Sequence, residues 1–326
     1  GLELLKFVHL EEGIVPPKFI VGATSHIEPL DHCESEFKKF GWPVVNYSAD
    51  DQILFDILKN QIKYIQRGEL TVDIAIITAL RAVELEEILR LPLNWTKVPS
   101  LGEDVIHLGH YKDKNDELKK VLATSCSRMG MVAAASTTTR ICERYEPGII
   151  FMTGIAAGIE GKVEIGDILI ADPCWDWGNG KRTIQNGKMV FQSAPHQLSL
   201  PDGLRQSLKD IAVERRFLDD IHASWTYPGK PPTALNLHVG PIATGAVVLE
   251  DPDTVSEIRR QHRETIGIEM EGYGVMQACS SSRKETTACI IKSVCDFADP
   301  EKNDNWQRYA AFSSSQFAYK LLTKVL

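Results

Sequence analysis

The sequence lacks the patterns that mark several special classes of protein. Its seven cysteines are an odd number and include no CxxC pair, so we expect reduced thiols and a cytoplasmic location. Its nine histidines have no spacing that suits metal ligands, and we predict no metal site and no other cofactor. No apolar run is as long as a membrane span, and no signal peptide opens the chain.

Basic residues are also fewer than acidic residues. The formal net charge is -8, from 36 Lys and Arg against 44 Asp and Glu. Broad nucleic-acid binding needs a basic surface, so nucleic acid is not an expected partner. A small anionic substrate held by a few local arginines remains compatible with this charge. The 326 residues, 43% of them hydrophobic, suit a globular protein of one large or two ordinary domains.

The sequence of the first 68 residues predicts a compact α/β domain, separate from the rest of the chain. The boundary falls at Glu69, and residues 69–326 form the second domain. Glycines close the two helices expected in the first domain. The expected elements are a strand at 18–22, a helix at 29–40, a strand at 43–48 and a helix at 52–66.

This first domain resembles the second half of a response-regulator receiver domain, which is flavodoxin-like. Gly1–Leu5 resembles the stretch after the phosphorylated Asp of that family, and Ile20–Thr24 resembles the strand that ends in its switch Thr. The phosphoacceptor Asp is absent, and Asn46–Ser48 stands where the family has a Lys. The resemblance implies a partial receiver, either truncated or degenerate, that docks on an upstream signalling partner and cannot take up phosphate.

The second domain carries one long pattern of strands, glycine turns and small residues. A helix rich in small residues follows Ser125–Gly130, and the T-G-x-A-x-G turn at 153–158 follows a strand. The strand V-x-x-G-D-I-L-I at 163–170 comes next. This order closely resembles the central signature of 5′-methylthioadenosine/S-adenosylhomocysteine nucleosidases and purine nucleoside phosphorylases.

The resemblance runs from about Val72 to the end of the chain. It implies a three-layer α/β fold of the phosphorylase/hydrolase type with a central mixed sheet, a purine nucleoside or nucleotide as substrate, and a homo-oligomer. A final helix at 306–325 should cover the sheet. Residues 178–235 hold polar turns and a helix at about 204–217, and we interpret them as an insertion or an oligomer contact.

Two stretches near the C-terminus carry the residues for this chemistry. Glu269 and Glu271 flank Met270, and Asp296 follows an apolar strand at 287–291. Breaking a glycosidic C–N bond builds positive charge on the sugar and negative charge on the base, so both ends benefit from a carboxyl group. The resemblance implies that Asp296 protonates N7 of the base. It also implies that Glu271 binds the ribose 2′ and 3′ hydroxyls, with Met270 against the sugar and Glu269 beside the substrate.

A further glutamate is expected to hold the attacking water in this family. The strand at 72–78 ends at the carboxyl edge of the sheet, where sites in α/β proteins form. Glu84 is the candidate, although it falls one residue later than the family's commonest spacing, at which Val83 would align. Glu86 and Glu87 are the alternatives. Glu84 could also be an ordinary residue in the first turn of a helix.

Other positions follow from the same resemblance. Ser127 would contact the ribose or the water, and Lys292 stands where the family often has an Arg. The base pocket wall would include Val248, which replaces a frequent aromatic residue. Trp175 and Trp177 could stack on the base in its place, or could serve packing and oligomer contacts alone.

Water is the expected nucleophile, and a nucleotide is the favoured substrate. Phosphorylases usually place an Arg and a Ser where this chain has Met152 and Ile155. Arg81 and Arg128 lie near two helix openings, where they suit a 5′-phosphate or triphosphate.

We therefore predict that adenine is released from ATP or AMP, as implied by a similarity to the ATP nucleosidase effectors of two-component-like anti-phage systems. The alternatives are a methylthioadenosine/S-adenosylhomocysteine nucleosidase, a phosphorylase and a non-catalytic nucleoside sensor.

Overall fold

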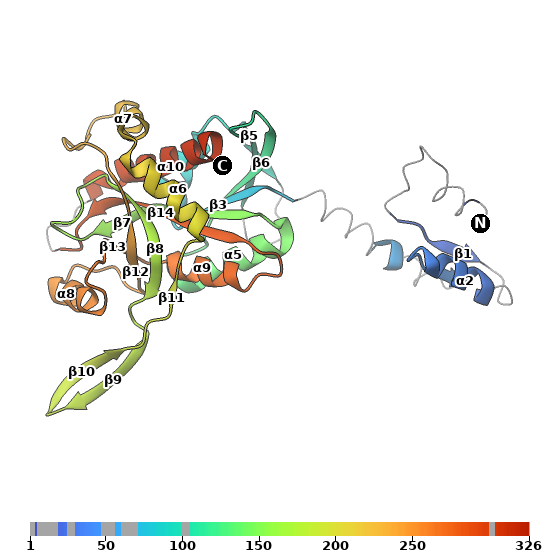
Figure 1. Ribbon diagram of the computed structural model, residues 1–326, viewed down its shortest axis with the longest axis horizontal. Helices are drawn as coiled ribbons and strands as arrows, with labels where there is room; N and C mark the ends of the chain where they lie inside the picture. The colour runs from blue at the N-terminus through green and yellow to red at the C-terminus, as the bar shows by residue number, and fades with distance from the viewer. Residues whose placement is uncertain are drawn as a thin grey trace. The chain divides into compact units, whose positions relative to one another are not determined.

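The computed structural model describes residues 4, 19–24, 30–46, 56–59, 71–98, 105–299 and 304–325. The chain divides into two compact units, Gly1–Leu70 and Thr71–Leu326 (Figure 1). Each unit is built around its own strands. None of the helices formed by these described residues is long and apolar enough to cross a membrane.

The first unit contains one strand–helix–strand motif. Strands β1 (Gly22–Thr24) and β2 (Val44–Asn46) pair in parallel, and α2 (Leu30–Lys39) connects them. A parallel pair requires such a crossover because a short turn can join only antiparallel strands. Phe37 is buried and packs against Gly22, which has no side chain to obstruct the ring.

Helix α2 and strand β2 lie within the expected helix at 29–40 and the expected strand at 43–48. The first strand begins at Gly22, after the described residues 19–21, which are not in a strand. Of the helix expected at 52–66 only residues 56–59 are described, and they are helical. Most of Gly1–Leu5 lies outside the described residues, as do Tyr47 and Ser48. The receiver-like character of this unit stays a prediction.

The second unit is organised around one mixed sheet. Its strands are hydrogen-bonded in the order β11-β8-β12-β13-β7-β3-β6-β5-β4, and β14 pairs with both β7 and β8. The strands are β3 (Ile74–Thr78), β4 (Thr96–Val98), β5 (Ile106–Lys112), β6 (Leu118–Ser125), β7 (Ile149–Gly158), β8 (Ile168–Asp176), β11 (Gln197–Leu198), β12 (Leu237–Thr244), β13 (Gly267–Glu269) and β14 (Thr287–Asp296).

Five of these strands pair with one another in a closed ring. Strand β7 pairs with β13 and β14, β8 pairs with β12 and β14, and β12 pairs with β13. The ring is therefore β7-β14-β8-β12-β13, and β3, β6, β5 and β4 extend from β7 as an open sheet. The β-branched run at 74–78 is fully buried, as expected for a strand covered on both faces.

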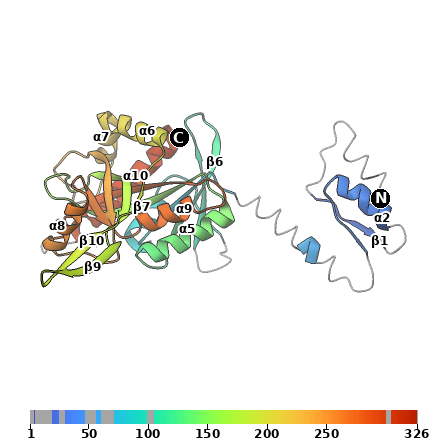
Figure 2. The same ribbon diagram turned by 60° about the horizontal axis from the view of Figure 1, so that its bottom comes forward.

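Helices cover both faces of the sheet, as Figure 2 shows. Helices α5 and α9 pack against each other on one side, and α10 lies across β7 and β14 on the other. The helices are α4 (Glu86–Leu89), α5 (Met131–Tyr145), α6 (Asp202–Val213), α7 (Arg215–Ala223), α8 (Pro252–Gln261), α9 (Gly272–Ser280) and α10 (Gln307–Lys324), with short turns η1 (Arg81–Leu85) and η2 (Asp304–Trp306). The expected α/β arrangement with a mixed central sheet is confirmed.

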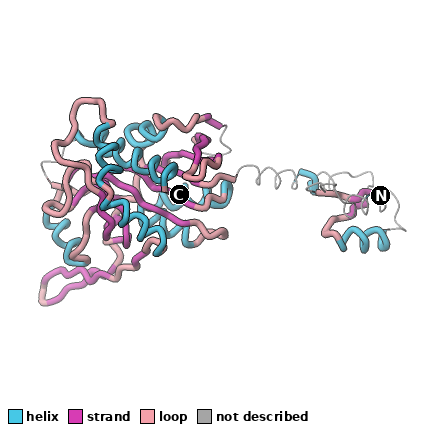
Figure 3. The backbone as a smooth tube through the Cα atoms, turned by 45° about the horizontal axis from the view of Figure 1, so that its top comes forward, coloured by secondary structure: helices cyan, strands magenta, loops and turns pink. Residues whose placement is uncertain are grey.

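The segment between β8 and β12 differs from its prediction. Strands β9 (Gly180–Gln185) and β10 (Lys188–Ser193) form a hairpin that projects from the body (Figure 3). Both turn residues, Asn186 and Gly187, have positive φ, as the tightest hairpin turns require. The single helix expected at 204–217 is wrong: Glu214 has non-helical angles and separates α6 from α7.

Candidate active site

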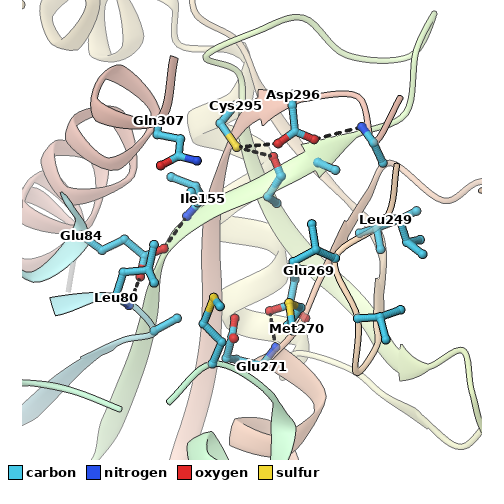
Figure 4. Close-up of a pocket in the computed structure, with 18 residues that line it drawn as sticks. Leu80, Glu84, Ile155, Leu249, Glu269, Met270, Glu271, Cys295, Asp296 and Gln307 are labelled. Atoms are coloured by element: carbon cyan, nitrogen blue, oxygen red, sulfur yellow. Dashed lines mark hydrogen bonds between the residues drawn. The ribbon is translucent and has the colours of Figure 1, made fainter. Parts of the chain in front are cut away.

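A cavity opens where several strands of the ring end. Its lining residues come from the ends of β3, β7, β13 and β14, from the loop after β12 and from the start of α10. The empty space, part of it open to solvent, is about 740 Å³, which suits a small organic ligand. Most of the wall is apolar, but Figure 4 shows carboxylates on separate sides: Glu84 beside Leu80, Glu271 below and Asp296 opposite.

Glu84 is fixed by two backbone groups. Its side chain is almost fully buried, and its carboxylate accepts hydrogen bonds from the Leu80 N–H at 2.7 Å and the Ile155 N–H at 2.9 Å. Burial raises the pKa of Glu84, while the charge of Lys292 and the two hydrogen bonds act against this rise. Each oxygen of the carboxylate therefore accepts one backbone hydrogen bond while the residue lines the cavity.

A strained turn brings Glu84 to this place. Val83 has φ 76° and ψ -64°, the angles of a rare γ-turn, and a β-branched residue adopts positive φ only under strong constraint. The Leu85 N–H donates to the Leu80 carbonyl five residues earlier, so the turn is one residue wider than an α-helical turn. Glu84 lies one residue later in the sequence than the family's commonest spacing predicts. The wider turn at Val83 accommodates this additional residue, so that Glu84 still lines the cavity.

The two alternative glutamates lie elsewhere. Glu86 is exposed, and the buried Glu87 pairs with Arg90 and lies 3.5 Å from Arg308. Neither is among the described residues that line the cavity.

Gly154 leaves the space that Glu84 occupies. A Cβ placed on Gly154 would overlap the Glu84 carboxylate. Residues 153–158 were expected as a turn, but they form the second half of strand β7. Glycine is needed at position 154 because the Glu84 side chain fills the space that a Cβ would take.

Lys292 is a fully buried cation among buried carboxylates. Its Nζ lies 3.2 Å from Glu271 Oε2 and 3.4 Å from Glu269 Oε2. Burial alone would lower the pKa of Lys292, but the charges of the surrounding glutamates, Glu84 included, raise it above its usual value. The lysine therefore stays charged and partly neutralises this group of acids.

The two glutamates beside Met270 have different surroundings. The Glu269 carboxylate accepts from the N–H groups of Glu271 and Gly272 and from the Thr244 hydroxyl. These partners fix it at the start of α9. Glu271 accepts at one oxygen from the Gly130 N–H, at 2.8 Å, and faces Lys292 with the other. Glu269, Met270 and Glu271 all line the cavity.

Asp296 ends β14 on the opposite side of the cavity. Its Oδ1 accepts from the Ala298 N–H at 2.9 Å, and the Cys295 thiol lies 3.2 Å from its Oδ2. The residue is 8% exposed, so a small part of the carboxyl group reaches the open space. Asp296 is therefore positioned by its own turn and remains accessible to a ligand.

The remaining candidates divide into those at the cavity and those away from it. Val248 lines the cavity, whereas Ser127, Arg128 and Arg81 are exposed and are not among its described lining residues. Arg128 and Arg81 adjoin the lining residues Met129 and Leu80 in the sequence. Trp175 and Trp177 are not among the described lining residues. They pack behind the wall in a cluster with Leu249, Ile268 and Ala298.

Leu80, Met129 and Gln307 are among the lining residues that were not singled out from the sequence. Met129 could have been found, because it adjoins Ser127 and Arg128. No local sequence pattern marks Gln307. It is the first residue of α10, and only the packing of that helix brings it to the cavity. Among the described residues, no group of three or more His, Cys, Asp or Glu is arranged to hold a metal ion.

The sequence pattern of the phosphorylase superfamily matches residues 73–325. The chain belongs to the phosphorylase superfamily. This confirms the family resemblance of the second unit and assigns no family to the residues before it.

Three individual proteins illustrate the similarity. An uncharacterised protein of Sinorhizobium fredii, y4jS, is 26% identical over the whole of this chain and 83% of its own length. The ATP nucleosidase Cap17 of Escherichia coli is 24% identical over 60% of this chain, a match that spans 39% of Cap17. A crystal structure of a Helicobacter pylori 5′-methylthioadenosine/S-adenosylhomocysteine nucleosidase with 5′-methylthioadenosine superposes with a TM-score of 0.61 at 20% identity, covering 77% of this chain and 97% of that one.

Proposed function

We propose that this superfamily member is a purine nucleosidase that hydrolyses the N-glycosidic bond of an adenine nucleoside or nucleotide and releases adenine. One observation carries the proposal: Asp296 at the end of β14, Glu271 just after β13 and the buried Glu84 in η1 border a single cavity. The names of the relatives, ATP nucleosidase and methylthioadenosine nucleosidase, support the same reaction.

Each carboxyl group then has one task. Asp296 in its protonated form donates to N7 of the base, so that the C–N electron pair leaves with a neutral purine. Glu271 binds the ribose hydroxyls and helps to offset positive charge on the sugar. Glu84 orients a water molecule and accepts its proton as the water oxygen bonds to C1′. The products are adenine and a free ribose or ribose phosphate.

The surroundings of Glu84 favour water over phosphate as the nucleophile. The Ile155 side chain lines the cavity beside it, and Met152 is fully buried in β7. Neither side chain can bind an anion, and the negative charge of Glu84 would repel phosphate. A hydrolase is therefore the better supported choice within the superfamily.

Two observations bear on the 5′ group of the substrate. Arg81 and Arg128 directly adjoin the lining residues Leu80 and Met129, which favours a 5′-phosphorylated substrate such as ATP or AMP. Leu80 and Met129 themselves are apolar, and this favours a thioether as the second candidate. We place the nucleotide first because two cations flank this end.

The same proposal gives the protein a role as an anti-phage effector that depletes adenine nucleotides. In this view the receiver-like residues 1–68 restrain the activity until an upstream partner signals. The support is the resemblance of that segment to receiver domains, together with the similarity to Cap17.

The test is to incubate the full chain with ATP, AMP, adenosine and methylthioadenosine, with and without phosphate, and to measure free base by chromatography. We expect adenine without added phosphate. Release that depends on phosphate would replace hydrolysis by phosphorolysis, and methylthioadenosine as the best substrate would favour the second candidate.

A further inference from the structure

A group of basic residues lies along the open end of the sheet next to the cavity. It consists of Arg81 in η1, Lys97 in β4 and His107 in β5, and is called the basic edge below. Lys97 and His107 face each other as a cross-strand pair, and His107 is paired on its other side with Ala123 of β6. Strand β6 in turn pairs with β3, which leads directly into Arg81. The register therefore places Lys97 and His107 side by side on the two outer strands, with β6 between them and β3, the strand that precedes Arg81.

The basic edge has no acidic counterpart within the described part of the chain. No ion pair or side-chain hydrogen bond of Arg81 or Lys97 occurs there. The Nδ1 atom of His107 is buried and has no hydrogen-bond partner. Burial lowers the pKa of His107, and the positive charges of Lys97 and Arg81 lower it further, so these two cations lie close enough to disfavour a charge on the ring. An anion bound here would be attracted by both cations and would accept a hydrogen bond from the ring.

The basic edge adjoins the end of the cavity that would receive the 5′ side of a nucleoside. With the base at Asp296 and the ribose hydroxyls at Glu271, the rest of the sugar points away from Asp296. Figure 4 shows Leu80 on the side opposite Asp296. Arg81 follows Leu80 directly, so the basic edge starts at this side and continues along the strand order to His107 on β5 and Lys97 on β4.

We propose that the basic edge binds the distal phosphates of an adenine nucleoside 5′-triphosphate and makes the enzyme prefer ATP to AMP and AMP to adenosine. The inference rests on the proposed nucleosidase function. Adjacent strands lie about 4.8 Å apart, so the long side chains of Arg81 and Lys97 and the ring between them offer donors at several successive positions. A triphosphate is an extended anion that can use them in series, whereas a single 5′-phosphate reaches only the first.

The direct test compares kcat/KM for ATP, AMP and adenosine in the wild type, Lys97→Ala and His107→Gln. Losing one charge-assisted hydrogen bond should lower the ATP value about tenfold or more. The adenosine value should change by less than about twofold, because adenosine has no phosphate to lose. His110→Gln and Lys188→Ala serve as controls: His110 is exposed three residues along β5, Lys188 is exposed in the β9–β10 hairpin, and both should leave all three values unchanged.

The result that overturns the proposal is an equal loss for ATP and adenosine, or no loss for ATP. Binding of inorganic tripolyphosphate, measured by calorimetry, separates this outcome from failure of the nucleosidase function. Tripolyphosphate binding that is weakened by Lys97→Ala supports the basic edge even if no base is released. Cleavage of adenosine without tripolyphosphate binding rejects the basic edge and keeps the nucleosidase.

Discussion

Glu84 and Gly154 fit so closely that neither can change without moving the other. Replacing Gly154 by Ala puts a methyl group where the Glu84 carboxylate lies. Displacement of a catalytic group by about 1 Å can cost on the order of 100-fold in rate, so we expect a loss of about that size in kcat. Gly148 begins the segment that forms β7, and a Cβ there meets only the Asp73 carbonyl at an ordinary 3.6 Å. Gly148→Ala should keep its activity, and equal rates for the two variants would contradict this role of Gly154.

Lys292 is the cation on which the buried acids depend. Lys292→Met would leave Glu269 and Glu271 as close buried carboxylates without their nearest positive charge. Breaking such a group by removing one partner costs about 3–5 kcal/mol of unfolding free energy. Urea unfolding followed by circular dichroism measures this change. Lys292→Arg keeps the charge and should lose clearly less, so comparable losses in the two variants would show that shape, not charge, matters here.

Single residues differ in how well the sequence predicts their place. Glu271 and Asp296 could be assigned because each belongs to a short motif whose backbone fixes the side chain. The γ-turn at Val83 could not be foreseen, because no residue type signals a strained turn and Val is among the least suited. For Trp175 the sequence left stacking on the base and packing as alternatives, and the side chain is wholly buried, since a strand residue faces whichever side its register dictates.

At the scale of elements, the contact between α5 and α9 positions the sugar end of the cavity. Helix α5 begins just after Gly130, whose N–H holds Glu271, and α9 begins just after Glu271 itself. A Cβ on Gly274 of α9 would overlap the Met131 carbonyl at the start of α5. This glycine is therefore what lets the two helices approach.

Gly274→Ala should push these helices apart. Overpacking of this kind costs about 1–3 kcal/mol, and the displaced Glu271 should reduce activity as well. Gly203, also helical, has no atom within 4 Å of its Cβ position, so Gly203→Ala should be neutral or slightly stabilising. Thermal unfolding and activity of both variants provide the comparison. A Gly274→Ala protein as stable and active as Gly203→Ala would contradict the account.

The elements that bear the site were predictable, and those far from it less so. The strand at 74–78 is rich in β-branched residues, and its type and last residue follow from that pattern. Other end points did not follow, since β8 begins at Ile168 and not at Val163, and β14 runs on to Asp296 and does not end at Ile291. The hairpin β9–β10 was missed although Asn186-Gly187 is a strong turn signal, because its strands are polar and mostly exposed. The break at Glu214 has no Pro or Gly to mark it, so α6 and α7 were taken as one helix.

At the scale of the whole molecule, the described site belongs to one unit. All the carboxylates that line the cavity come from Thr71–Leu326, the part that the superfamily pattern matches from residue 73 onward. The similarity to y4jS also covers the residues before it. The first unit is therefore shared with at least one relative.

The central claim is that Asp296 drives departure of the base from this cavity. The most direct test is the rate of adenine release from ATP in phosphate-free buffer by the wild type and Asp296→Asn. Asn keeps the size of the side chain and its hydrogen bond from Ala298 but cannot donate a carboxylic proton. Loss of a general acid should reduce the rate by about 100- to 10,000-fold, with adenine binding retained as proof of folding. An unchanged rate in Asp296→Asn would contradict the account.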